Sequence, residues 1–293
     1  MTTPLPFDDR DGLIWLDGAF VPWREARLHV LTHGLHYGGG VFEGMRVYGG
    51  RIFRLAEHSR RLAASARELG FALPFEPAEL DRAAEELVER AGIADGYVRP
   101  VAWRGSEQLS VSGAGTSVHV AVAAWEWPNV FSSAAQERGI ALGTSKWRRP
   151  APDTAPVRAK AASLYNICTL ARDAAEADGY DDALLLDYRG YLAEATGANL
   201  FLVVDGALHT PLADVFLDGI TRQTVIALAG EAGIAVHEGH LPPEALERAQ
   251  EVFLTGTAYE VQPVRAVDGR PYEVGPVTRA LADAYARLVR GAL

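Results

Sequence analysis

Hydrophobic and polar residues at the start of the chain follow patterns typical of β-hairpins. An apolar run over residues 13–21 is interrupted at 17–18 by Asp-Gly, and a strand-like segment over 41–53 is interrupted at 49–50 by Gly-Gly. Both pairs supply the positive φ angles that tight hairpin turns require. The chain is therefore predicted to contain two hairpins near its beginning.

A change of period predicts helices after the second hairpin. Apolar residues recur every three or four positions over 55–69 and again over 80–91, which places them on one face of a helix. Strands are predicted around 97–103 and 118–124. The following stretch, 125–137, contains Pro128 and loses its period, so we expect a linker there.

The second half repeats this mixture. Helices are predicted over 165–177, 221–232, 243–249 and 276–290, and strands over 183–187 and 199–204, the latter closed by a turn at Asp205-Gly206. Mixed order with hairpins favours an α+β fold over a regular doubly wound sheet. We predict a small N-terminal domain over 1–127, a linker over 128–138 and a larger domain over 139–293.

Composition narrows the class of protein. The chain has 293 residues, 48% of them hydrophobic and 23% charged, with a net charge of −10. These values argue against disorder, and an acidic chain without a basic block is a poor ligand for nucleic acid or an anionic membrane. The start, MTTPLPFDDRDG, has no apolar segment, and no run is long enough to span a bilayer, so we expect a cytoplasmic protein. Cys168 is the only cysteine, and we interpret it as a small buried hydrophobic residue.

Lysine is scarce, and this makes one position informative. Only Lys146 and Lys160 are lysines among 28 basic residues. Lys146 precedes Trp147 and two arginines, which is typical of a surface position. Lys160 lies among small and apolar residues just before a predicted helix, either as a surface side chain or as an amine nucleophile. An apolar setting lowers the pKa of an amine, and arginine cannot replace an amine nucleophile.

Other segments offer partners for such an amine. Glu194 lies beside small residues that open into an apolar strand, so its carboxylate needs a partner, either an arginine, a backbone cap or a protonated ring nitrogen. The segments 218–222 and 255–258 offer backbone N–H groups and hydroxyls to an anion. With Lys160 they describe a pyridoxal phosphate site. The histidines form no metal-binding pair on a helix, with His33 and His36 expected on a loop, so no metal site is predicted.

In these segments and others the chain resembles the class IV, or fold type IV, pyridoxal-phosphate aminotransferases, and most closely the branched-chain amino acid aminotransferases. The resemblance runs from Trp15 to about Val277. It is carried by seven segments in the order of the family: His36-Tyr37-Gly38 with Val41-Phe42-Glu43-Gly44-Met45-Arg46, Tyr97-Val98-Arg99-Pro100, Ala159-Lys160-Ala161, Glu194 to Phe201, Pro211, Gly219-Ile220-Thr221-Arg222 and Thr255 to Glu260.

The resemblance implies an α+β fold with a small N-terminal α/β domain and a larger C-terminal pseudo-barrel α/β domain, the active site lying at the domain and dimer interface. It implies pyridoxal 5′-phosphate as cofactor and Lys160 as the residue that forms the internal aldimine and carries the proton. Glu194 would pair with the pyridine nitrogen and Tyr165 with the ring hydroxyl. The phosphate would be bound by Arg61, Ile220, Thr221 and Thr257.

The resemblance also implies a substrate pocket and a reaction. The pocket would be formed by Tyr37, Phe42, Arg46, Tyr97, Arg99, Thr257 and Ala258, with Tyr37 coming from the partner subunit of a homodimer or dimer-based oligomer. The amino group of L-leucine, L-isoleucine or L-valine would pass to 2-oxoglutarate. No nucleic acid or membrane partner is expected.

Three departures from the family pattern bear on substrate range. Ser163 and Leu164 stand where glycine and asparagine are common, the linker aromatic is replaced near Val130 although Trp127 is present, and the loop over 104–111 lacks the usual glycine–methionine sequence. A D-amino acid or (R)-amine transaminase and an aminodeoxychorismate lyase, which share the fold, therefore remain the alternatives.

Overall fold

The computed structural model describes residues 6–127 and 133–291. The chain divides into two compact units, Met1–Pro128 with Ala159–Ser163 and Asn129–Arg158 with Leu164–Leu293. The segment Ala159–Ser163 belongs to the first unit because Ala161 forms an antiparallel bridge with Val41. The predicted boundaries at 127 and 139 remain a prediction, and residues 128–132 of the predicted linker lie outside the described residues.

The first unit is built on an antiparallel sheet. Its described residues form seven strands in the order β2-β1-β7-β6-β4-β5, with β3 also paired to β6. The strands are β1 (Leu13–Leu16), β2 (Ala19–Pro22), β3 (Gly40–Phe42), β4 (Met45–Tyr48), β5 (Arg51–Ile52), β6 (Gly96–Arg104) and β7 (Val118–Glu126). The two predicted hairpins are confirmed, since Asp17, Gly18, Gly49 and Gly50 all have positive φ.

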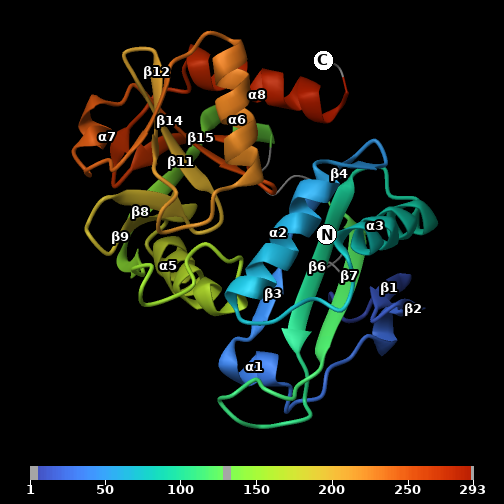
Figure 1. The fold of residues 1–293 in the computed structure, drawn as a ribbon. Helices are drawn as coiled ribbons and strands as arrows, with labels where there is room; N and C mark the ends of the chain where they lie inside the picture. The colour runs from blue at the N-terminus through green and yellow to red at the C-terminus, as the bar shows by residue number, and fades with distance from the viewer. Residues whose placement is uncertain (1–5, 128–132, 292–293) are drawn as a thin grey trace. The chain divides into compact units, whose positions relative to one another are not determined.

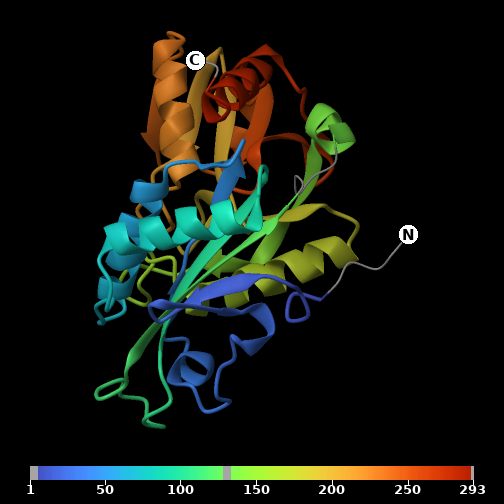
Figure 2. The ribbon, with the colours of Figure 1, turned by 90° about the vertical axis from the view of Figure 1, so that its right-hand side faces the viewer.

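Helices cover one face of this sheet. The helices α2 (Leu55–Glu68) and α3 (Pro77–Ala91) pack on the same side of β6 and β7 (Figures 1 and 2). Their apolar faces bury Leu62, Ala66, Leu80, Ala84 and Leu87 against alternate residues of the strands. Because successive strand residues point to opposite faces, the residues between these point to the other side of the sheet.

The second unit contains a mixed sheet. Its described residues form nine strands in the order β10-β9-β8-β15-β14-β11-β12-β13, and a further β10–β11 pairing joins this path back on itself, which gives a pseudo-barrel. The strands are β8 (Ile140–Arg149), β9 (Asp182–Asp187), β10 (Leu192–Ala195), β11 (Asn199–Val204), β12 (Ala207–Pro211), β13 (Val236–Gly239), β14 (Glu251–Gly256), β15 (Glu260–Val267) and β16 (Arg270–Pro271).

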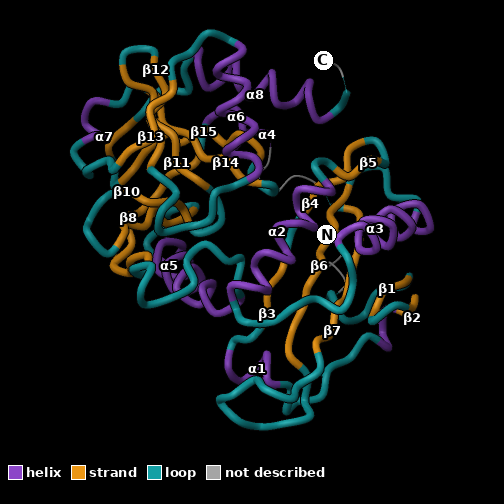
Figure 3. Tube along the Cα trace, in the orientation of Figure 1, coloured by secondary structure: helices purple, strands orange, loops and turns teal. Residues whose placement is uncertain are grey.

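Helices pack on these strands within the second unit. The helix α5 (Tyr165–Ala177) lies against β8 and β9, and α6 (Ile220–Glu231) and α8 (Pro276–Val289) pack near β14 and β15 (Figure 3). The mixed order of helices and strands confirms the α+β prediction. Cys168 lies inside α5 with 6% of its surface exposed, which confirms its interpretation as a buried residue.

Some local predictions were wrong. His33 and His36 lie on a short helix, α1 (His33–Tyr37), rather than on a loop. The helix α4 (Ser133–Arg138) lies within the stretch predicted to be a linker, and that linker stays a prediction. The helix predicted over 243–249 is shorter, α7 (Ala245–Arg248). A five-residue helix is too short to show a period, so sequence pattern cannot detect it.

Two findings concern the described residues as a whole. No helix in residues 6–127 and 133–291 is long and apolar enough to cross a membrane. In the same ranges, no three or more His, Cys, Asp or Glu side chains are grouped so that they could hold a metal ion.

Candidate active site

Backbone hydrogen bonds hold Lys160 in the first unit. Its N–H donates to Ser65 Oγ of α2 at 3.0 Å, and its carbonyl accepts from the N–H of Phe42 at 3.1 Å. The side chain is half-buried, and its Nζ lies 5.0 Å from the centroid of the Phe42 ring. The amine therefore stands beside an aromatic wall. Lys146, by contrast, is exposed on β8, as predicted.

The sheet face opposite α2 and α3 brings together four of the residues predicted to bind substrate, Phe42, Arg46, Tyr97 and Arg99. Arg46 pairs with Tyr97 across β4 and β6. The Arg99 guanidinium lies 4.7 Å from the centroid of Phe42 and donates to Tyr97 Oη at 3.4 Å. The structure thus brings Lys160 and these four residues onto one surface of the first unit.

Two guanidinium groups on this face have unused donors. Arg46 is 4% exposed, yet its Nε and Nη1 have no hydrogen-bond partner among the described residues, and the same holds for Arg99 Nε. A buried donor without a partner costs free energy, and a charged one costs more. Donors of this kind fit a carboxylate ligand.

A close approach explains why glycine stands at position 44. A Cβ built there would lie 1.8 Å from Tyr97 Oη, so any other residue would displace the phenol ring. Trp127 fixes the ring from another side in an edge-on contact with centroids 4.5 Å apart. Gly44 and Trp127 thus hold the Tyr97 ring beside Arg99.

Arg61, predicted to bind the cofactor phosphate, is engaged by a carboxylate in the first unit. Its Nε and Nη2 donate to the two oxygens of Glu43 at 2.6 and 2.9 Å, while His58 Nδ1 lies 2.7 Å from Glu43 Oε2. Glu43 follows β3, and its side chain is completely buried. No role was predicted for Glu43 or His58, although a charged residue directly after an apolar strand segment is a detectable signal.

Glu194 lies on β10 of the second unit beside two polar partners. Arg149 Nε of β8 is 3.3 Å from Glu194 Oε1, and Asn199 Nδ2 of β11 is 3.3 Å from Oε2. The arginine is one of the partners that the sequence left open. The Glu194 side chain keeps 12% of its surface exposed. Neither Arg149 nor Asn199 was predicted as a partner of Glu194. Arg149 is distant from it along the chain, and Asn199 lies on an adjacent strand.

The start of α6 offers backbone N–H groups. The first N–H groups of a helix have no intrahelical acceptor, and the first turn of α6 contains no acidic residue that would oppose an anion. A Cβ at the N-cap, Gly219, would lie 2.2 Å from Asn199 Oδ1. Asn199 therefore connects the Glu194 strand with the helix that begins at Ile220 and Thr221.

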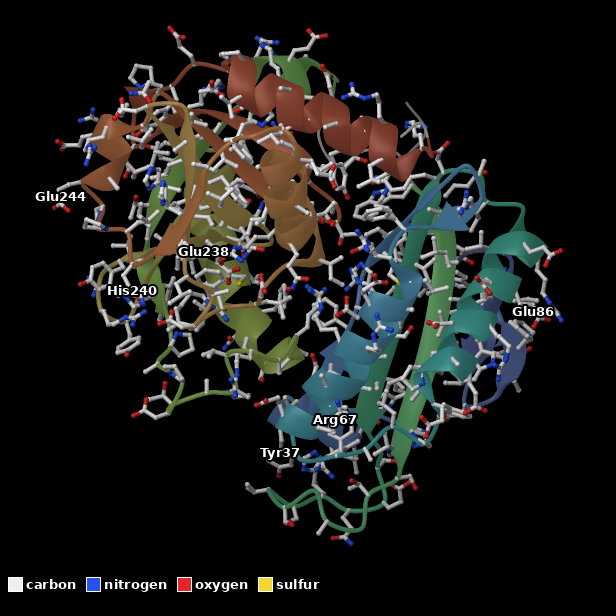
Figure 4. All side chains as sticks on the ribbon, turned by 45° about the horizontal axis from the view of Figure 1, so that its top comes forward. Tyr37, Arg67, Glu86, Glu238, His240 and Glu244 are labelled. Carbon is white, nitrogen blue, oxygen red and sulfur yellow. The ribbon has the colours of Figure 1, made fainter. Side chains whose placement is uncertain are left out.

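Arg222 fixes the first turn of α6 through contacts with other residues of the second unit. Its guanidinium is 2% exposed, with bonds to Asp218 at 2.9 Å, to the Pro211 carbonyl at 3.0 Å and to Glu238 of β13 at 2.5 Å (Glu238 is labelled in Figure 4). A cation paired in this way holds the first turn of α6 in place without contacting an outside ligand. The arginine of the Gly-Ile-Thr-Arg segment is thus structural.

The turn between β14 and β15 contains Thr257 and Ala258, both half-buried. Directly after them, the Tyr259 hydroxyl donates to Asp182 Oδ2 at 2.6 Å and accepts from Arg172 Nη1 at 2.9 Å. Burial, together with the charge of Asp182, raises the pKa of Tyr259, so the phenol keeps its proton. This network anchors the turn that is predicted to bind phosphate and carboxylate.

The remaining predicted residues are placed as follows. Tyr165 is the first residue of α5 and is half-buried, and Tyr37 ends α1 with 43% of its surface exposed (Figure 4). Ser163 packs beside Gly38, where an added Cβ would lie 2.8 Å from the Ser163 Cβ. Leu164 is buried, and Val130 lies outside the described residues.

A comparison with family models decides the family. The model described as Amino-transferase class IV matches residues 40–267, which include every predicted site residue except Tyr37. The chain belongs to the class IV aminotransferases. The sequence-based prediction of a class IV transaminase with an α+β fold is confirmed.

Similar proteins agree with this assignment. A "Probable branched-chain-amino-acid aminotransferase" of Rickettsia bellii is 44% identical over 95% of this chain and 96% of the relative. A branched-chain amino acid aminotransferase from T.th., crystallised with pyridoxamine 5′-phosphate, has a TM-score of 0.94 and 43% identity over 97% of this chain and 96% of that one. The same T.th. enzyme with N-(5′-phosphopyridoxyl)-L-glutamate gives a TM-score of 0.92, also at 43% identity and with the same coverage. The predicted cofactor agrees with what these class IV structures hold.

Proposed function

We propose that this class IV aminotransferase transfers the amino group of L-leucine, L-isoleucine or L-valine to 2-oxoglutarate, with pyridoxal 5′-phosphate bound at Lys160. The observation that carries the proposal is the Phe42 ring, which has the Lys160 amine 5.0 Å and the Arg99 guanidinium 4.7 Å from its centroid. An amine, a carboxylate binder and an apolar wall are the groups that an apolar α-amino acid requires.

The available groups fit pyridoxal phosphate. The cofactor needs an amine, an acid for its ring nitrogen, a hydrogen-bond partner for its ring hydroxyl and donors for its phosphate. Lys160, Glu194 and Tyr165 match the first three. Backbone N–H groups of Ile220 and Thr221 at a helix N-terminus, the Thr257 hydroxyl and the Arg61 guanidinium match the fourth. The Glu194 side chain is 12% exposed although Arg149 lies beside it.

Each residue then has a physical task. When bound, pyridoxal phosphate supplies a carbonyl and an electron-accepting ring that stabilise negative charge at the α-carbon of the substrate. Lys160 would bind the cofactor through Nζ and carry the α-proton on the same atom. Glu194 would hold a proton at the ring nitrogen, and Tyr165 would orient the ring through its hydroxyl oxygen.

Substrate binding rests on the open face of the sheet in the first unit. Arg99 and Arg46 would bind carboxylates through donors that have no partner among the described residues, with Tyr97 orienting Arg99. Phe42 would contact an aliphatic side chain. The turn at Thr257-Ala258 would supply further donors to the α-carboxylate. The glutamate adduct held by the T.th. relative supports glutamate and 2-oxoglutarate as the second substrate pair.

We also propose that the enzyme works in the cytoplasm as a homodimer or dimer-based oligomer. Tyr37 is 43% exposed at the end of α1, so its ring is available to a second copy of the chain. The single cysteine of the sequence, Cys168, is buried and has no second cysteine to pair with, as is common in reducing compartments. Sedimentation at several concentrations tests the oligomer, and a monomer at all of them would contradict it.

The two lysines allow a matched test of cofactor attachment. The purified protein is expected to show visible absorbance that persists through dialysis. Borohydride reduction followed by peptide mapping should place the pyridoxyl group on the peptide with Lys160. Lys160→Ala is expected to abolish the band, whereas Lys146→Ala should keep it, since Lys146 is exposed. Labelling of Lys146, or a colourless wild-type protein with added cofactor, would overturn the proposal.

A half-reaction panel tests the substrate. Holoenzyme is mixed separately with L-leucine, D-alanine and (R)-1-phenylethylamine, and the visible band is followed. We expect L-leucine alone to bleach it, and 2-oxoglutarate to restore it afterwards. Bleaching by D-alanine or by the amine, without bleaching by L-leucine, would assign the enzyme to a different class IV activity.

A further inference from the structure

A buried polar cluster lies behind the predicted phosphate-binding arginine. Glu43, between β3 and β4, is 0% exposed, and both of its oxygens are bound by α2 residues. Arg61 uses Nε and Nη2 at 2.6 and 2.9 Å, and His58 Nδ1 lies 2.7 Å from Oε2. Because residues 58 and 61 are one turn apart, they share the face of α2 that meets the strands.

The surroundings of Glu43 and His58 set the protonation state of each side chain. Burial disfavours the anion of Glu43, but the charge and hydrogen bonds of Arg61, with the hydrogen bond from His58, hold the pKa of Glu43 well below its usual range. Burial lowers the pKa of His58, even though Glu43 acts in the opposite direction. His58 is therefore neutral near pH 7. Because a carboxylate only accepts hydrogen bonds, His58 donates to it from Nδ1–H.

The side-on ion pair fixes the plane of the guanidinium. Two of its five N–H groups bond to Glu43, so the arginine cannot rotate without breaking both bonds. Glu43 is inaccessible, whereas the Arg61 side chain is 17% exposed and therefore presents an edge beyond the cluster. The buried acid thus acts on outside ligands only through the arginine.

The same helix also supports the amine. Ser65, one turn beyond Arg61, accepts the backbone N–H of Lys160 at 3.0 Å, and the charge of Lys160 contributes to the lowered pKa of His58. One face of α2 therefore carries supports for the amine and for the arginine. A shift of Arg61 relative to this face would separate two groups that must bind the same cofactor.

We propose that Glu43, held in place by His58, is a positioning residue that orients Arg61 toward the phosphate of the cofactor. The proposal rests on the proposed function, in which Arg61 binds that phosphate. An arginine that is already fixed loses less side-chain entropy when the phosphate binds, and the phosphate is therefore bound more tightly. The effect depends on the phosphate and is absent for pyridoxal, which lacks it.

The test measures the affinity of apoenzyme for pyridoxal 5′-phosphate and for pyridoxal by visible titration. In Glu43→Gln the volume is kept, but the amide nitrogen faces an Arg61 donor, so the pair becomes misaligned. We expect the affinity for pyridoxal 5′-phosphate to fall about tenfold, and the affinity for pyridoxal to stay unchanged. Glu57→Gln on the exposed side of the same helix is the control and should bind both as the wild type does.

A second pair of variants tests the role of His58 and does not depend on the folding of Glu43→Gln. His58→Asn retains a side-chain N–H near the position of Nδ1, and His58→Leu does not. We expect Asn to preserve the preference for the phosphorylated ligand and Leu to weaken it. Equal preference in both variants would contradict the proposal, as would a wild-type preference in a folded Glu43→Gln.

The outcome for Arg61→Gln separates the two proposals. If the wild type binds neither ligand, the proposed function fails. If it binds both equally well, or if Arg61→Gln keeps the wild-type preference for the phosphorylated ligand, the role of Arg61 fails. If Arg61→Gln loses this preference while Glu43→Gln and His58→Leu keep it, Arg61 binds the phosphate without help from Glu43, and the present inference alone is overturned.

Discussion

Two buried carboxylates, Glu43 in the first unit and Asp182 in the second, are held by different chemistry. Both are 0% exposed. Glu43 is bound by a guanidinium and a neutral imidazole, whereas Asp182 accepts hydroxyl donors from Thr196 at 2.5 Å and Tyr259 at 2.6 Å. Arg172 reaches Asp182 only at 3.4 Å.

The difference shows how a buried charge can serve a site. The Glu43 cluster ends in Arg61, whose partly exposed cation can bind an outside anion. The Asp182 cluster ends in side chains that fix two turns, one containing Thr196 and the other preceding Tyr259. An ion pair therefore orients the guanidinium that we propose to bind the phosphate in one unit, and hydrogen bonds from hydroxyls set the backbone in the other.

Breaking the ion pair should have the largest effect. Glu43→Ala leaves the Arg61 cation without its buried partner, and we expect the free energy of unfolding to fall by about 3–5 kcal/mol. Urea denaturation followed by tryptophan fluorescence measures the loss. Glu57→Ala on the exposed part of the same helix is the control, expected within about 0.5 kcal/mol of the wild type. Similar losses for the two variants would contradict the expectation that the buried carboxylate contributes more to stability than the exposed one.

The hydroxyl network should be weaker per bond. Tyr259→Phe removes the phenol donor to Asp182, and we expect a loss of about 1.5–3 kcal/mol because the acceptor is charged. The KM for the amino acid should rise because the adjacent turn is less fixed. Tyr272→Phe removes the hydroxyl that donates to the uncharged Leu246 carbonyl at 3.1 Å, and a loss of about 0.5–1.5 kcal/mol is expected. A greater loss for Tyr272→Phe would contradict the comparison.

The imidazole gives the first network a pH dependence. The folded pKa of His58 is below its ordinary value of 6.5, so below that pH the unfolded chain takes up a proton that the folded protein does not. The free energy of unfolding should therefore decrease as the pH is lowered, by up to about 1.4 kcal/mol per pH unit from this group. Denaturation curves between about pH 7 and about pH 5 should show a smaller slope in His58→Asn. An unchanged slope would show that His58 does not titrate in this way.

An exposed ion pair on α3 is expected to contribute least to the free energy of unfolding. Arg90 Nε donates to Glu86 at 2.8 Å on the outer side of α3, where Glu86 points away from the sheet (Figure 4). Both side chains are nearly half exposed. We expect Arg90→Ala to change the free energy of unfolding by no more than about 0.5 kcal/mol. A loss comparable with that of Glu43→Ala would mean that burial does not set the strength of these pairs.

Local signals predicted many elements. The Asp-Gly turn at 17–18 and the bounds of α5 agree with the structure because turn chemistry and helical period are encoded within a few residues. The strands β8, β14 and β15 were not predicted. Each contains a run of consecutive buried residues, which lacks the alternation of buried and exposed positions that identifies a half-buried strand.

The candidate site shows the same division. Lys160 could be selected from the sequence because arginine replaces lysine at almost every other basic position. Arg149 could not be assigned to Glu194, since the two residues come from different strands and 45 positions separate them along the chain. Likewise, no local pattern indicates that Asn199 connects Glu194 with the start of α6.

By itself, the sequence determined the family and the order of most helices and hairpins, and it singled out Lys160 as the candidate amine, because these depend on residue identity and short-range spacing. Tertiary structure alone decided that Glu43 and His58 support Arg61, and that Arg46 and Arg99 keep donors without partners among the described residues. Such relations arise when strands and helices pack, since burial gives a charge its consequences only after its neighbours are in place.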